Sequence, residues 1–304
     1  MSFRLRWLSA SLAILAVSPA YADPFFFSTG NPDGLIATAS RPDSPGRPEI
    51  EAGDDFVLTQ NAHITGGSFT GLLTGGASLA SIGQVVVEIY RVFPLDSDVS
   101  RTSGAPTFST VQVPTRVNSP SDDAFATRSS TASELMFVAA TVQASFTANN
   151  SVLNGIHPMP GQFTGGDGAV TGQEVSFNLS FSSALDLPAD HYFFVPQVQL
   201  TTGEFYWLSA PRPIVPPGVA FPTGTTDLQS WIRNAALAPD WLRVGTDIVG
   251  GNPVPTFNGA FTLTGTVAAV PEPATSALML LGLAAVGAVA RRRQRVRAPS
   301  CPPC

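Results

Sequence analysis

Three acidic side chains crowd into one short stretch of the chain. Glu51, Asp54 and Asp55 fall within five residues, beside a predicted strand at 56–59. Calcium takes six to eight oxygen ligands, and carboxylates at the ends of strands can supply several of them. Calcium is therefore the candidate ion here, with Glu51, Asp54 and Asp55 as its ligands. Ordinary turn chemistry, in which Asp side chains cap backbone amides, is the alternative.

Four aromatic residues are candidates for stacking on a sugar ring. Two of them lie on a predicted strand at 204–209, and the other two follow within 35 positions: Tyr206, Trp207, Trp231 and Trp241. Alternation along a strand puts Tyr206 and Trp207 on opposite faces, so one of the two must face the core. Core packing is the alternative for all four rings, because large aromatics dominate β-sheet cores.

No arrangement of residues nominates a catalytic centre. The three histidines, His63, His157 and His191, have no metal-binding partner at close spacing, and neither H-E-x-x-H nor G-x-S-x-G occurs. The sequence therefore predicts no catalytic residue and a protein that is not an enzyme. A hydrolase assembled from distant residues stays open as an alternative.

Charge and cysteine content restrict the partners. Charged residues make up 12% of the chain, lysine is absent, and residues 23–269 hold nine arginines against 21 acidic residues, a net charge near −12. Such a surface disfavours nucleic acid and anionic membranes as partners. The only cysteines are Cys301 and Cys304, so the rest of the chain must be stabilised by its core without disulfides.

The elements that position these residues are strands. Apolar and polar residues alternate at 138–147, 175–182 and 257–267, which is typical of antiparallel strands with one buried face. In the first of these the pattern predicts that Val138, Val142 and Phe146 face the core. Many short strands separated by Gly- and Pro-rich turns predict an all-β fold, an antiparallel β-sandwich of the jelly-roll kind.

One segment, 227–237, has helical periodicity instead. Its apolar side chains recur at the spacing i, i+3, i+4 and i+7, as Leu228, Trp231, Ile232 and Ala235. Residues at this spacing share one face of an α-helix. We therefore expect one short helix within the sandwich.

The first 22 residues have the pattern of a secretory signal peptide. An apolar core at 8–17 follows two arginines, and Ala20 and Ala22 form an A-x-A site. Signal peptidase is expected to cut there and to leave Asp23 as the first residue of the exported protein. Residues 23–269 then form the β-sandwich body.

The region 270–304 has three parts. The residues Val270, Pro271, Glu272 and Pro273 come first, an apolar run at 274–290 follows, and a basic tail at 291–304 begins with Arg291, Arg292 and Arg293. At about 1.5 Å per residue the run is about 25 Å long as a helix, close to the thickness of a bilayer core. The arginines would keep their end in the cytoplasm. A plain tail anchor would share these two features.

The same three parts in this order resemble the PEP-CTERM sorting signal of Gram-negative bacteria. The resemblance implies that exosortase, an integral-membrane enzyme, recognises the motif around Glu272 while 274–290 spans the inner membrane. It also implies delivery to the cell surface or the extracellular matrix, with exopolysaccharide of a biofilm as a candidate partner. We thus expect a non-enzymatic surface or matrix protein; the alternatives are a calcium-stabilised carbohydrate-binding module and a secreted hydrolase acting on polysaccharide or peptide.

Overall fold

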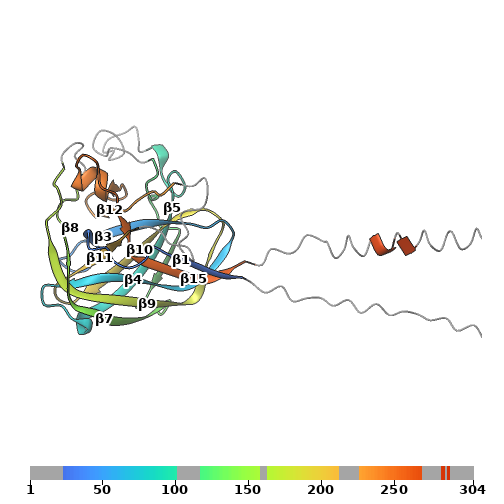
Figure 1. The fold of residues 1–304 in the computed structure, drawn as a ribbon, viewed down its shortest axis with the longest axis horizontal. Helices are drawn as coiled ribbons and strands as arrows, with labels where there is room; N and C mark the ends of the chain where they lie inside the picture. The colour runs from blue at the N-terminus through green and yellow to red at the C-terminus, as the bar shows by residue number, and fades with distance from the viewer. Residues whose placement is uncertain are drawn as a thin grey trace, which may run out of the picture. The chain divides into compact units, whose positions relative to one another are not determined.

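The computed structural model describes residues 23–100, 117–157, 163–211 and 226–268, with two short helical pieces at 282–284 and 286–287. All the strands belong to one compact unit, Ala22–Ala268, shown in Figure 1. Several predicted features lie outside the described residues: Ala20, Ala22, Val270, Pro271, Glu272, Pro273, Arg291, Arg292, Arg293, Cys301 and Cys304. Within the described ranges no helix is long and apolar enough to cross a membrane, and most of the predicted span at 274–290 lies outside them.

The larger of two sheets is built around its long central strand, β4. Along one edge of β4 run first β15 and then β11, and along the other edge runs β9, which pairs in turn with β7. The nine strands are β1 (Pro24–Ser28), β2 (Ile36–Ala39), β4 (Ala62–Thr74), β7 (Leu135–Ala148), β8 (Asn150–Val152), β9 (Val170–Leu187), β11 (Glu204–Ala210), β14 (Asn258–Gly259) and β15 (Phe261–Val267). One pairing, β2 with β8, is parallel.

The smaller sheet has six strands, and all its pairings are antiparallel. Their order across the sheet is β13 (Leu242–Arg243), β12 (Trp231–Asn234), β3 (Ile50–Val57), β10 (His191–Leu200), β5 (Ile82–Arg91) and β6 (Ala126–Ser129). The described part of the unit also contains a 3-10 turn, η1, at Leu79–Ser81 and a π-helical turn, η4, at Val244–Val249.

The two sheets pack face to face over a shared aromatic core. Phe194 of the smaller sheet stacks on Phe261 of the larger one with ring centroids 4.9 Å apart. The ring of Phe56 is tilted against that of Phe27, with centroids 6.1 Å apart. Side chains from both inner faces therefore exclude water between the layers. The all-β prediction is confirmed, whereas the jelly-roll topology stays a prediction.

The alternation predicted for β9 and β15 matches their burial. Val175, Phe177 and Leu179 of β9 are buried, as are Phe261 and Leu263 of β15. Each strand thus turns one apolar face to the core, as a period of two requires.

The face predicted for β7 is wrong over most of the strand. Val138 and Val142 are 68% and 53% exposed, whereas Phe137 packs against the core. Register shifts between Thr141 and Gln143, and again before Phe146, interrupt the pairing of β7 with β9. These shifts break the regular period of two, and beyond them an even-numbered residue, Phe146, packs against the core.

The helix predicted at 227–237 is also wrong. Residues Trp231–Asn234 form strand β12, which pairs with β3 on one side and β13 on the other. Trp231 and Ile232 are both fully buried, but they belong to different apolar clusters on opposite faces of the sheet. A strand covered on both faces can carry apolar residues at successive positions. Here Trp231 and Ile232 are such neighbours, and with Leu228 and Ala235 they matched a helical spacing.

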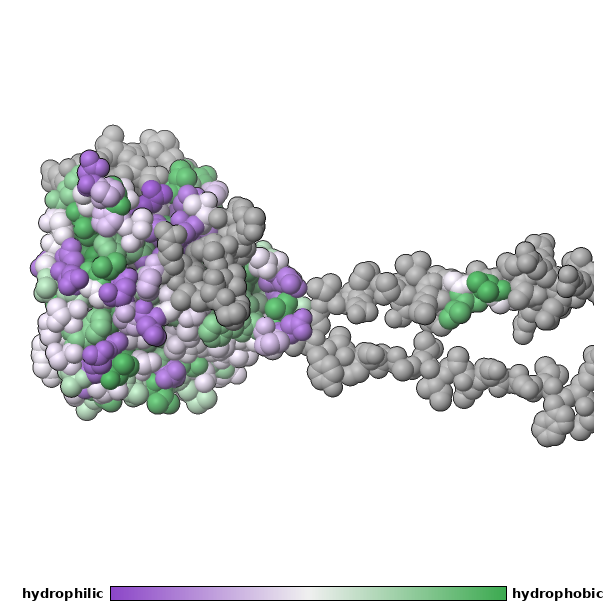
Figure 2. Space-filling view, viewed as in Figure 1, coloured by the Kyte–Doolittle hydropathy of each residue, from purple (hydrophilic) through white to green (hydrophobic). Residues whose placement is uncertain are grey.

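A second, smaller apolar cluster covers the outer face of the six-stranded sheet. It consists of Tyr90, Phe193, Val195, Leu228, Trp231 and Trp241. Elsewhere, Figure 2 shows hydrophilic and hydrophobic residues interspersed over the described part of the visible face. Such mixing is ordinary for a protein surface in contact with water.

Candidate functional site

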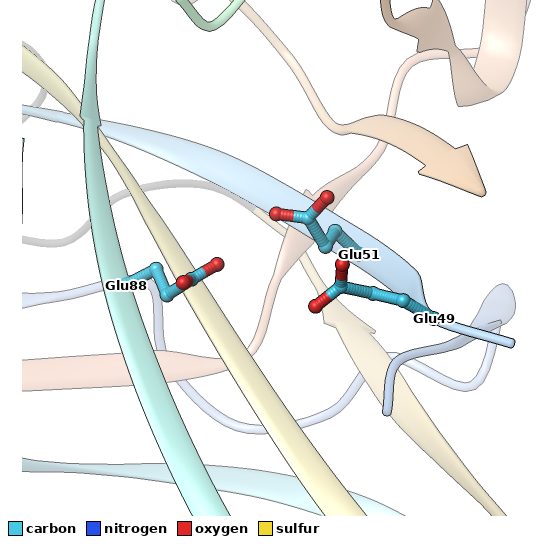
Figure 3. A group of neighbouring side chains, drawn as sticks. All are labelled: Glu49, Glu51 and Glu88. Atoms are coloured by element: carbon cyan, nitrogen blue, oxygen red, sulfur yellow. The ribbon is translucent and has the colours of Figure 1, made fainter. Parts of the chain in front are cut away.

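Three glutamates approach one another on the outer face of the smaller sheet (Figure 3). Glu49 directly precedes β3, Glu51 lies on β3, and Glu88 lies on β5. One carboxylate oxygen from each lies within 4.8 Å of the others. We call these three residues the acidic cluster. Strand β10 lies between β3 and β5, so the glutamates reach toward one another across it.

Arg233 of β12 compensates the buried charge of Glu51. Its guanidinium donates through Nε to Glu51 Oε2, and through Nη2 to Glu51 Oε1 over 3.0 Å. The same guanidinium lies over the ring of Trp241, 4.3 Å from its centroid. Because Glu51 and Arg233 are both buried, each depends on the other to avoid an uncompensated charge.

Tyr90 connects Glu51 to Glu88. Its hydroxyl oxygen lies 2.6 Å from Glu51 Oε1 and 3.0 Å from Glu88 Oε2, and it accepts a hydrogen bond from Arg233 Nη2 over 2.8 Å. One hydroxyl proton can serve only one carboxylate. The shorter contact assigns that proton to Glu51, so the contact with Glu88 is satisfied when Glu88 itself is protonated.

The electrostatics of the acidic cluster agree with a protonated Glu88. Burial, together with the negative charge of Glu51, raises the pKa of Glu88 to about 8. Burial also raises the pKa of Glu49, with Glu51 as the second cause. For Arg233 burial alone would lower the pKa, but Glu51, Tyr90 and Glu88 together outweigh burial and raise the pKa overall. Near neutral pH the cluster therefore holds a proton.

The acidic cluster fits a divalent cation only in part. Its oxygens are close enough together to share an ion, and carboxylates suit calcium. However, the carboxylate of Glu51 already accepts hydrogen bonds from Arg233 and Tyr90. An ion would also have to displace the proton on Glu88. The acidic cluster is therefore a poor site for calcium, which the sequence predicted for Glu51, Asp54 and Asp55 instead.

The predicted calcium ligands Glu51, Asp54 and Asp55 do not converge on one point. Alternation along β3 puts Glu51 and Asp55 on the outer face and Asp54 on the inner one. Asp55 Oδ2 accepts a hydrogen bond from the Leu228 amide over 3.0 Å and lies 2.5 Å from His191 Nε2. The two acidic neighbours on adjacent positions thus point away from each other.

Asp54 is fully buried on the core side of β3. In the described part of the chain neither of its carboxyl oxygens has a well-aligned hydrogen-bond partner. Burial raises its pKa well above the ordinary value, and the charges of Asp55 and Asp227 add to the effect. Burial therefore favours the protonated form of Asp54 in the folded protein.

The four aromatic candidates are packed inside the protein. Tyr206, Trp207, Trp231 and Trp241 are all buried. The indole nitrogens donate to backbone carbonyls, for example from Trp207 to Ala260 over 3.0 Å and from Trp241 to Ser121 over 3.1 Å. None of the four rings presents an open face on which a sugar could stack.

Sequence reasoning did not single out Glu88, Tyr90 or Arg233, the residues that complete the acidic cluster. Glu88 and Tyr90 lie on β5 and Arg233 lies on β12, both far from Glu51 of β3 along the chain. One signal was available: arginine and glutamate inside apolar strands, at 233 and 88, are costly unless they are paired. That cost predicts a partner for each but does not identify it.

Comparison with known proteins identifies the C-terminal region alone. No curated protein and no solved structure matches the chain. The family model of the PEP-CTERM protein-sorting motif matches residues 269–294, which include the predicted recognition residues at 270–273 and the arginines at 291–293. This match confirms the resemblance noted from the sequence. The chain therefore carries a PEP-CTERM protein-sorting motif, the signal through which exosortase sorts exported proteins to the cell surface.

Proposed function

We propose that this chain is a non-enzymatic protein of the cell surface or extracellular matrix, delivered there by exosortase. The sorting motif at 269–294 carries the proposal. The last strand of the body, β15, ends at Val267, so a single residue separates the body from the matched motif. Before processing, the body would be held close to the inner membrane.

The delivery route follows from the charges and prolines of the two ends. Signal peptidase removes 1–22, and the arginines from Arg291 onward keep the end of the 274–290 run in the cytoplasm. The sequence Pro271-Glu272-Pro273 disfavours a helix at the motif, because each proline fixes its own φ and restricts the residue before it. Exosortase then recognises this open peptide and releases the body into the exopolysaccharide matrix.

The body's polar interior supports a structural role. Glu51, Arg233 and Tyr90 are buried, and Glu51 accepts hydrogen bonds from both of the others. A catalytic acid or base needs access to its substrate within hydrogen-bond distance. Glu51 of the acidic cluster is buried and has no such access to a substrate. The cluster instead stabilises one arrangement of the strands and makes the stability of the fold depend on pH.

Replacing Glu272 with Ala in the full chain tests the proposal in the native host. Cell fractions and medium are probed for the protein by immunoblotting. The parent should mature and reach the cell surface, whereas Glu272→Ala should accumulate at full length in the membrane. Asp43→Ala, which removes an exposed carboxylate of the body, is the matched control and should sort normally. If Glu272→Ala matures like the parent, the assigned recognition is wrong.

A further inference from the structure

One edge of the larger sheet is long and open. Strand β7 pairs with β9 along one side, and no other described strand pairs with it; Figure 1 shows it at the rim of the body. The strands at the other ends of the two sheets are short: β1 has five residues, β6 four, β8 three and β13 two, whereas β7 has 14. Proteins commonly keep edge strands short, because their unpaired backbone groups attract a further strand.

The pairing with β9 shows which backbone groups of β7 face the open side. At the start of the pairing the Ser182 amide donates to the Glu134 carbonyl over 2.9 Å, and the register then places Met136 opposite Ser180. In an antiparallel pair, alternate residues direct both of their backbone groups to the same neighbour. The even-numbered residues therefore bond to β9, and the odd-numbered residues of 135–141 direct their amides and carbonyls to the open side.

This edge also lacks the side chains that usually protect an edge strand. None of the 14 residues of β7 is charged or a proline, although residues 23–269 hold 21 acidic residues against nine arginines. Met136 and Val138 are 64% and 68% exposed. The register is regular from Leu135 to Thr141, and the two bulges follow only after Thr141. We call Leu135–Thr141 the open edge.

A second copy of the open edge is complementary to the first. Val138 is its central residue, so a two-fold axis through Val138 pairs two copies antiparallel along the whole segment. Val138 then lies opposite its own counterpart and Met136 lies opposite Ala140, while the odd-numbered residues exchange backbone hydrogen bonds. Apolar side chains meet apolar side chains, which stabilises a cross-strand pair. No charge is desolvated, whereas a charged strand would find no opposite charge on this edge.

We propose that two copies of this protein associate through the open edge and form one continuous sheet across the dimer. The regular part of each open edge is then paired on both sides. A two-fold contact of this kind is closed, so assembly stops at two copies. The proposal goes beyond sorting and does not depend on it.

Cysteine cross-linking tests both the contact and its register, because residues 23–269 contain no cysteine. Facing Cα atoms in a pair without mutual backbone bonds lie about 4.5 Å apart, which a disulfide can span. The protein is purified from its host with Cys301 and Cys304 replaced by serine. Val138→Cys should then form a covalent dimer on oxidation with copper–phenanthroline, as seen on a denaturing gel.

Val142→Cys is the matched control for this cross-link. Val142 is also exposed and lies on the same strand. In the proposed pairing its two copies lie four positions on either side of the axis, about 27 Å apart, so Val142→Cys should stay monomeric. Equal cross-linking by both variants, or none by Val138→Cys, would overturn the proposed pairing.

Sedimentation equilibrium measures the association without a cross-link. At about 100 μM, where a dimer with a micromolar dissociation constant is populated, the parent should have twice the mass of one chain. Val138→Lys should raise the dissociation constant at least about tenfold, because two lysines would face each other at the axis. Val254→Lys, at an exposed loop position outside β7, should associate like the parent.

Thermal unfolding of both lysine variants shows that they fold, and normal sorting of Val138→Lys in cells separates this proposal from the sorting one. A monomeric parent would contradict the proposal, as would undiminished association of Val138→Lys. Assemblies larger than two copies would contradict the closed two-fold contact.

Discussion

The protonated state of Glu88 leads to a stability prediction with a definite sign. Burial raises the pKa of Glu88 from 4.5 to about 8 in the folded protein, with Glu51 as the second cause. The folded state therefore holds a proton that the unfolded chain loses above pH 4.5. The contribution of this proton to the free energy of unfolding is fully present below pH 4.5 and is lost as the pH rises toward 8. Each pH unit corresponds to about 1.4 kcal/mol. With an allowance for partial solvent screening, the free energy of unfolding should fall by about 3 kcal/mol between pH 5 and pH 8 because of Glu88.

Glu88→Gln should remove this cost, because glutamine has the shape of protonated glutamate and never ionises. At pH 5 the free energy of unfolding of the variant should lie within about 1 kcal/mol of that of the parent. At pH 8 it should exceed that of the parent by about 3 kcal/mol. Urea unfolding at both pH values, followed by fluorescence of the buried tryptophans, measures the difference. Asp54 and Asp55 also have raised pKa values, but their effect cancels between variant and parent.

Glu134→Gln is the matched control for Glu88→Gln. Glu134 lies on an exposed turn, where its carboxylate meets water in the folded and unfolded chain alike. The control should leave the pH dependence of stability as it is in the parent. If Glu88→Gln changes stability equally at pH 5 and pH 8, the assignment of a proton to Glu88 is refuted.

Three further perturbations test the buried ion pair, the packing of the larger sheet and the charge balance of the acidic cluster. Arg233→Met should lower stability by about 3–5 kcal/mol in urea unfolding, because it leaves Glu51 buried without its partner; a loss below about 1 kcal/mol would contradict that pairing. A Cβ on Gly259 would lie 2.2 Å from the ring of Trp207, so Gly259→Ala should cost about 1–3 kcal/mol. Gly83→Ala, whose Cβ would have ordinary contacts, should cost less, and the reverse order would be inconsistent with this core. Chelation with EDTA at pH 7 should shift the unfolding midpoint by less than about one degree, because arginine and proton already balance the acidic cluster; a fall of several degrees would show a bound structural ion.

The sequence was most informative where one strand face is unambiguously apolar. In β9, Val175, Phe177 and Leu179 occupy odd positions, and the even positions between and after them hold serine and asparagine. All three apolar side chains are buried, as this alternation predicted. In β7, alanine occupies both parities and two bulges interrupt the pairing. Period-two reasoning cannot detect a bulge, because the extra residue leaves no mark in the composition.

The site was harder to predict than the fold. Glu51 was identified as one member of an acidic group, but its actual neighbours, Glu88 and Arg233, come from strands far away in the chain. Asp54 and Asp55 were grouped with it by proximity in sequence, although alternation along β3 separates Asp54 from Glu51. Contacts across a sheet depend on strand order, which a single sequence does not specify.

The most direct test of the central claim is the intact mass of the protein recovered from the cell surface or medium of its native host. Delivery by exosortase predicts a chain that begins at Asp23 and ends near Pro271–Pro273, without the apolar run and the arginines. A recovered protein that retains residues 274–304 would contradict processing through the sorting motif.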